Sequence, residues 1–150
     1  MATLTPTLTL ASTDVFASHP INLTVTDSLA VEAPMSDISR MNTNDNIGNG
    51  AGIILVEATT DIYYIYVKHS GILASDGKTL ANTTADYILL SNADGESPWG
   101  RLYPGEFVFY AQNAYDGSDG GGGATDQGGL KITAASTAVQ VNYGFWKRTS

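Results

Sequence analysis

The chain has 150 residues, with 15 acidic against 7 basic side chains and a formal net charge of −8. This length predicts one domain that buries roughly 70% of the surface of its unfolded state. An acidic balance opposes binding to phosphate backbones, so we expect no nucleic-acid partner. The lack of cysteine excludes disulfides, Cys-ligated zinc and thiol catalysis.

The first residues, Met-Ala-Thr-Leu-Thr-Pro, have no basic start and no apolar run, so we expect no signal peptide. No apolar stretch approaches the length of a membrane span, and we expect no membrane partner.

Residues 3–10 alternate Thr with Leu or Pro, which is typical of a half-buried strand. Pro6 cannot donate to a strand ladder, so we expect an edge strand or an extended arm over residues 1–11. In the functional interpretation, this arm contacts a neighbouring subunit; an ordinary edge strand is the alternative. The candidate contacts in this segment are Leu4, Pro6, Leu8 and Leu10.

Residues 21–31 predict one long strand, or two strands with a bulge near Asp27. Residues 36–41 are compatible with one helical turn capped by Ser36. Residues 42–52 predict a long polar loop, which lacks the glycine and the glutamate that a calcium loop needs at its sixth and twelfth positions.

Three apolar stretches then predict strands, at residues 53–56, 62–67 and 87–90. Between the last two we expect a loop over residues 70–86, with a tight turn at 75–78.

The stretch from Arg101 to Tyr110 predicts a Pro-Gly corner followed by a strand in the middle of the packed structure. Pro104 favours the first central position of a type II turn, and Gly105 the positive φ of the second. A Gly-rich segment over residues 112–129 follows. Residues 130–133 and 138–143 predict a final hairpin.

Together these elements predict an all-β fold: a single-domain β-sandwich or jelly roll of about eight strands, with long loops rich in Gly, Asn and Asp. The expected core includes Ile62, Ile65, Val67, Leu89, Phe107, Phe109, Val139 and Val141.

No catalytic residue, metal site or cofactor site is predicted, and we expect no enzyme. His19 and His69 are the only histidines; we expect His69 at a strand end on the surface, and no nucleophile motif accompanies either one. The tyrosines and tryptophans suit a core or an interface better than a sugar-stacking face. Trp99, in a Pro-Trp-Gly turn, and Tyr103 are the candidate exposed contacts.

Three stretches within residues 53–148 have a distinctive sequence. They are the strand TTDIYYIYVKHSG after a GAG loop, the corner RLYPGEFVFYAQN before a Gly-rich loop, and the closing AASTAVQVNYGFWKR. These motifs resemble those of small β-sandwich virion proteins of tailed bacteriophages. The resemblance implies a capsid decoration (cement) protein, made in the host cytoplasm and bound to the capsid exterior. It implies the major capsid protein as a partner, and it brings no catalytic residue.

Self-association into a homotrimer is the oligomeric form that we expect, because many shell binding sites lie on threefold positions. Two alternatives remain open at this point: another virion component, such as a neck, tail or fibre subunit, and a carbohydrate- or receptor-binding module that uses Trp99 and the Tyr-rich loops.

Overall fold

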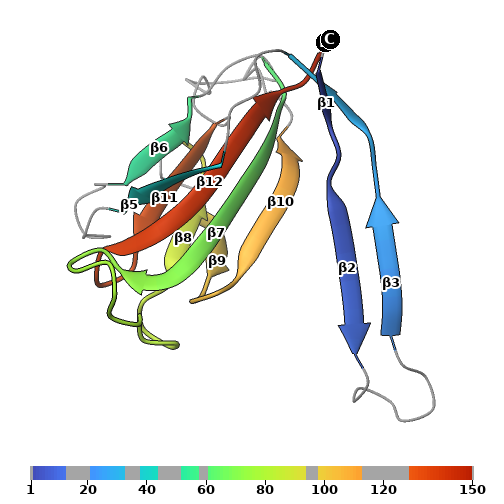
Figure 1. Cartoon of the computed structure of the whole chain (residues 1–150). Helices are drawn as coiled ribbons and strands as arrows, with labels where there is room; N and C mark the ends of the chain where they lie inside the picture. Colours follow the sequence, from blue (N-terminus) through green and yellow to red (C-terminus); the bar gives the residue numbers. More distant parts are fainter. Residues whose placement is uncertain are drawn as a thin grey trace. The chain divides into compact units, whose positions relative to one another are not determined.

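The computed structural model describes residues 2–12, 21–32, 38–43, 52–57, 61–93, 98–112 and 129–149, and all regular structure in these ranges is β-strand (Figure 1). The all-β prediction is therefore confirmed, and no helix in these ranges could span a membrane. The chain divides into two compact units. We call residues 1–35 with 148–150 the arm, and residues 36–147 the body.

The arm is a long antiparallel hairpin. Its strands are β1 (Ala2–Leu4), β2 (Thr7–Ser12), β3 (Ile21–Thr26) and β4 (Leu29–Val31). β1 pairs with β4 and β2 pairs with β3. The ladder is interrupted at Pro6, which has no N–H to donate; its carbonyl accepts a hydrogen bond from the N–H of Asp27 at 3.1 Å. The predicted strands on both sides of the hairpin, including the break near Asp27, are confirmed.

The carboxyl-terminal residues join the arm beside β4. Arg148 forms an isolated antiparallel bridge with Val31, and the N–H of Thr149 donates to the carbonyl of Ala30 at 3.3 Å. Val31 is fully buried at this point. The two ends of the chain are therefore held together in one unit.

The body consists of two four-stranded antiparallel sheets (Figure 1). The first has the order β10-β7-β12-β5, with strands β5 (Ser39–Asn42), β7 (Tyr63–Leu73), β10 (Phe107–Gln112) and β12 (Val139–Lys147). The second has the order β6-β11-β8-β9, with strands β6 (Ile53–Val56), β8 (Ile88–Ser91), β9 (Pro98–Leu102) and β11 (Leu130–Ala134). This arrangement is β-sandwich-like.

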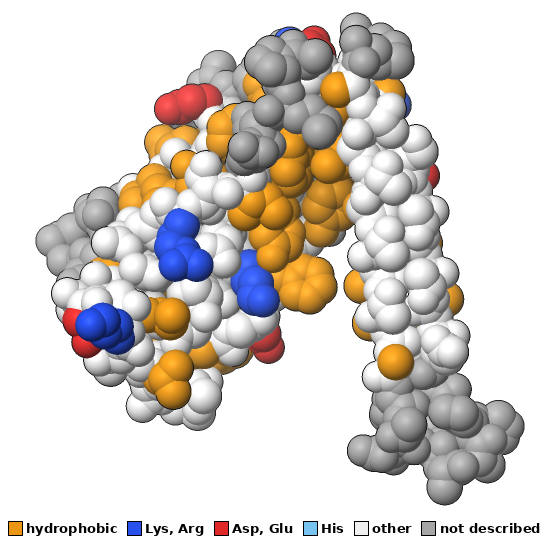
Figure 2. All heavy atoms as spheres, in the orientation of Figure 1, with side chains coloured by type: hydrophobic (Ala, Val, Ile, Leu, Met, Phe, Trp, Pro, Cys, Tyr) orange, Lys and Arg blue, Asp and Glu red, His pale blue; other side chains and the backbone are white. Residues whose placement is uncertain are grey.

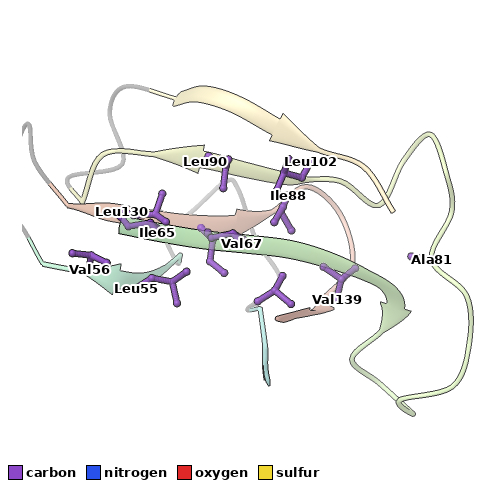
Figure 3. Close-up of a cluster of buried hydrophobic side chains, with 12 residues drawn as sticks. Leu55, Val56, Ile65, Val67, Ala81, Ile88, Leu90, Leu102, Leu130 and Val139 are labelled. Atoms are coloured by element: carbon purple, nitrogen blue, oxygen red, sulfur yellow. The ribbon is translucent and has the colours of Figure 1, made fainter. Parts of the chain in front are cut away.

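The core of the body is built from alternate residues of both sheets, whose side chains gather in one cluster (Figure 3). Alternation along each strand sends every second side chain to this cluster. The fully buried members include Ile65, Val67, Ile88, Leu90, Leu130, Ile132, Val139 and Val141. Burying each of these side chains contributes about 1.5–3 kcal/mol.

The predicted core is confirmed for Ile65, Val67, Val139 and Val141, whereas Ile62 and Leu89 are only half-buried. The prediction is wrong for Phe107, which is 54% exposed, and for Phe109, which is 37% exposed. β10 lies at the edge of its sheet and not in the middle. Both faces of this strand are apolar, so its sequence does not reveal that Val108 and Tyr110 face the core.

Three other predicted elements are corrected. β11 and β12 belong to different sheets, so the predicted final hairpin is a crossover between sheets. Residues 39–42 form β5, so the predicted helical turn is wrong there, while Ser36 lies outside the described residues. β7 runs on to Leu73, so the loop predicted from residue 70 begins later. Most of the polar loop at 42–52 and of the Gly-rich segment at 112–129 also lies outside the described residues.

The predicted tight turn at residues 75–78 is organised by Asp76. Its carboxylate accepts hydrogen bonds from the hydroxyl and N–H of Thr79 and from the N–H of Lys78. These bonds favour the ionised form and lower the pKa of Asp76 to about 2. Gly77 takes the positive φ of 67° within this turn.

The Pro104-Gly105 corner has the predicted type II geometry. The N–H of Glu106 donates to the carbonyl of Tyr103 at 2.9 Å, and Gly105 has a φ of 89°. The corner is also tied to β7, because the N–H of Gly105 donates to the carbonyl of His69 at 3.1 Å.

Replacing Gly105 with Ala is expected to lower the free energy of unfolding by about 1–2 kcal/mol, because L-residues disfavour this positive φ. An added Cβ would meet nothing within 4 Å, so the cost comes from the backbone alone. Gly100→Ala is the matched control: its Cβ would meet Leu90 Cδ1 at an ordinary 3.5 Å. Urea denaturation should show a loss of no more than about 0.5 kcal/mol for the control. Equal losses in both variants would contradict the turn assignment.

Candidate functional site

The one histidine that the structure describes is buried, and the prediction of a surface role at a strand end is wrong. His69 lies inside β7 with no exposed surface. Its Nε2 is 2.7 Å from the backbone carbonyl of Asp86, and its Nδ1 accepts the N–H of Gly71 at 3.0 Å. This pattern places the ring proton on Nε2. Both nitrogens are therefore engaged with the backbone.

The carboxylate of Asp86 and the hydroxyl of Ser136, near His69, form hydrogen bonds with groups other than the imidazole. The carboxylate of Asp86 accepts the N–H of Asn82 at 2.7 Å and the hydroxyl of Ser136 at 2.9 Å. Burial alone would raise the pKa of Asp86, but these hydrogen bonds, with one from Thr137, lower it. Burial lowers the pKa of His69, against the opposing effects of Asp86 and Glu106. This arrangement holds the neutral ring as a structural link between β7 and the loop before β8.

In the described part of the chain, titratable side chains do not gather elsewhere into a metal-like cluster. Within the ranges that the structure describes, no group of three His, Asp or Glu residues could hold an ion. The candidate functional features are therefore surfaces, of which the described residues form three.

The first surface is the apolar side of the arm. Leu8 lies directly opposite Val25, and Leu10 directly opposite Leu23, so the four side chains share one side of the hairpin. They are 44% to 48% exposed. We call these four residues the arm's apolar face. Of the contacts predicted in this segment, Leu8 and Leu10 belong to this face, whereas Leu4 and Pro6 are half-buried.

The other side of the arm hairpin is polar. Thr7 and Thr26 lie opposite each other with their hydroxyl oxygens 3.2 Å apart, and Thr9 lies opposite Thr24. The arm is thus amphipathic, although it is only two strands wide. An isolated two-stranded hairpin is at best marginally stable in water, which makes its exposed apolar face a candidate for contact with another surface.

The second surface lies on the outward side of the first sheet. The ring of Phe109 stacks beside that of Tyr64, with centroids 6.4 Å apart, and the ring of Phe107 lies 6.2 Å from that of Tyr66. We call these four residues the aromatic face. On the same side of the sheet the Trp146 ring lies over Gly144, where an added Cβ would come within 2.7 Å of the ring. In Figure 2, hydrophobic side chains reach the surface of both the arm and the body.

The third surface surrounds Trp99 on β9, which is 48% exposed. A shallow depression of about 390 Å³ is lined by Leu89, Pro98, Trp99, Gly100 and Arg101. The Arg101 guanidinium lies 5.0 Å from the centroid of the Tyr87 ring, which packs 5.5 Å from Tyr103. The structure therefore brings the predicted contacts Trp99 and Tyr103 to one region, while Tyr103 itself is half-buried.

Sequence reasoning missed several of these surface residues. Leu23 and Val25 have the same alternation as Leu8 and Leu10, and this parity was the signal that could have identified them. Phe107 and Phe109 were assigned to the core. Arg101 was not singled out, because a cation over an aromatic ring leaves no local sequence signal.

No protein-family model, curated protein or solved structure matches this chain.

Proposed function

We propose that this protein is a structural virion component that binds the outside of a phage capsid and stabilises contacts between major capsid subunits. The observation that carries the proposal is the arm's apolar face, which lies on one side of an amphipathic two-stranded hairpin and consists of half-exposed leucines and valine. A hairpin of this kind gains stability by docking on another chain, through backbone pairing or through its apolar side.

The charge and composition support a position on the outer surface of a shell. A net charge of −8 disfavours contact with packaged DNA. Repetition over a symmetric lattice lets modest contacts add up, because avidity multiplies the affinity of each one. The resemblance of the motifs in residues 53–148 to those of small phage virion proteins implies the same role.

The amount of this protein in purified particles tests the proposal. A copy number comparable to that of the major capsid protein, measured by quantitative mass spectrometry, is the expected result. A copy number that is a small fraction of it would assign the protein to a neck, tail or fibre instead. Absence from any particle would reject a virion role.

Deleting residues 2–10 tests whether the arm is the binding element. We expect the body to keep its near-ultraviolet circular dichroism, because its core comes from residues 53–141. Binding to particles should be lost. Unchanged occupancy of particles by the truncated protein would show that the arm is not the contact.

A carbohydrate- or receptor-binding module is the second candidate, and the depression beside Trp99 favours it. An exposed indole next to an Arg-Tyr pair offers a stacking surface and hydrogen-bond donors for a sugar ring. Binding on a glycan array that disappears in Trp99→Ala would support this candidate over the first.

A further inference from the structure

The described residues form two apolar surfaces that are exposed or half-buried, and the strands that carry them have matching lengths. The arm's apolar face lies on β2 and β3, and the aromatic face lies on β10 and β7. β2, β3 and β10 each have six residues, which corresponds to about 20 Å of strand. A docked hairpin would therefore reach along the whole of β10.

The chemistry of the two surfaces is also compatible. The arm offers branched aliphatic side chains, Leu and Val, and the aromatic face offers ring faces and edges. Aliphatic side chains against aromatic rings bury a large apolar area, and the hydroxyls of Tyr64 and Tyr66 are the only polar side-chain groups among the eight residues. Neither surface contains a charged residue among the four that define it.

The arm and the strand residues on the outward side of the first sheet differ in the sign of their net charge. The arm contains three acidic residues, Asp14, Asp27 and Glu32, and one basic residue, Arg148, so its net charge is negative. The described strand residues on the outward side of the first sheet include Lys68, opposite Phe107, and Arg40, opposite Asn142, and they include no Asp or Glu. Such complementarity favours the approach of the arm to this sheet and opposes the pairing of two acidic arms.

We propose that the arm of one copy docks its apolar face on the aromatic face of a second copy of this chain. The contact is heterologous, because each copy presents both a donor and an acceptor surface. Head-to-tail contacts of this type close into a ring when the rotation permits, and a trimer is one such ring. The inference concerns self-association only, so it holds or fails independently of the proposed role on a capsid.

Two pairs of substitutions in the full-length protein test the donor surface. Leu10→Glu with Leu23→Glu places two charges on the apolar face, at positions that lie opposite each other. Thr9→Glu with Thr24→Glu places the same two charges on the polar side of the next rung. Sedimentation over a range of concentrations should show a dissociation constant raised at least about tenfold in the first variant and changed by less than about threefold in the second.

The acceptor surface is tested in the same way. Phe107→Ser with Phe109→Ser removes the two exposed rings of β10, and Ile54→Ser removes a similarly exposed apolar side chain from β6 as the control. The first variant should lose self-association at least about tenfold, and the control should keep it. Every side chain replaced in these variants is exposed, so the melting temperature of the body checks that each variant is folded.

Mixing the donor variant with the acceptor variant gives the decisive result. Each variant is expected to be monomeric alone. Their equimolar mixture should form a heterodimer, because the acceptor variant still has an intact arm and the donor variant still has an intact aromatic face. A mixture that stays monomeric would overturn the heterologous contact, whereas an acceptor variant that still self-associates alone through its intact arm would indicate that arms pair with arms. A wild-type protein that is monomeric up to about 1 mM would overturn self-association altogether.

Discussion

Replacing Ile132 with Ala is expected to lower the free energy of unfolding by about 2–5 kcal/mol. Ile132 has no exposed surface and lies on the central strand β11, opposite Leu90 on one side and Ile53 on the other. Removing three carbon atoms there forfeits their burial and leaves a cavity that strands held in ladders on both sides cannot readily close. Urea denaturation measures the loss.

Ile54→Ala is the matched control for this prediction. Ile54 lies opposite Lys131, on the outward side of the same pair of strands, and is 42% exposed. The same chemical change should therefore alter stability by no more than about 1 kcal/mol. If both variants lost equal stability, the assignment of inward and outward sides in the second sheet would be wrong.

The same reasoning reverses what the sequence indicates for Phe107 and Phe109. If these two residues lay in the core, replacing either one with Ala would lower the free energy of unfolding by about 3–5 kcal/mol. As exposed residues on an edge strand, they should affect self-association more than folding. The sequence correctly predicts that side chains alternate along β10. It does not predict which side of the strand faces the core, because Phe-Val-Phe-Tyr is apolar on both sides.

Local structure is the part of this fold that the sequence predicts well. The positions of most strands, the break near Asp27 and the turns at Asp76 and Gly105 all follow from preferences within a few residues. Pairing between distant strands is different. β11 and β12 are separated by four residues, which is as suitable for a crossover between sheets as for a hairpin. The choice between a crossover and a hairpin depends on the strands with which β11 and β12 pair. These are β8 and β7, which are distant from them in sequence.

The candidate surfaces were predicted in part for a similar reason. Leu8 and Leu10 carry a visible alternation, but an exposed face and a buried face have the same pattern, and only the hairpin with Leu23 and Val25 shows that theirs is exposed. His69 illustrates the opposite case. A polar residue near a turn suggests the surface, yet this ring is buried because the backbone at Gly71 and Asp86 satisfies both nitrogens.

His69→Leu is expected to destabilise the body strongly at neutral pH. The variant keeps an apolar side chain of similar size but leaves the Asp86 carbonyl and the Gly71 N–H without their partner. Each buried group left unpaired costs about 1–3 kcal/mol. Urea denaturation at pH 7.5 measures this loss. A change within about 0.5 kcal/mol, typical of surface positions, would contradict the buried and doubly hydrogen-bonded state of the ring.

The pH dependence of the same pair of proteins isolates the histidine. Burial lowers the pKa of His69 below its ordinary value of 6.5, so below about pH 6.5 the unfolded chain binds a proton that the folded chain does not. Wild-type stability should therefore fall as the pH drops from 7.5 to 5, with a slope of up to about 1.4 kcal/mol per pH unit from this one group. The leucine variant lacks this proton, so the stability difference between the two proteins should shrink on acidification.

Two other titratable groups do not disturb this comparison. His19 is present in both proteins, so its contribution cancels. The lowered pKa of Asp86 affects stability only at lower pH, around and below its ordinary value of 3.8. A difference that stayed constant between pH 7.5 and 5 would mean that His69 titrates alike in the folded and unfolded chains.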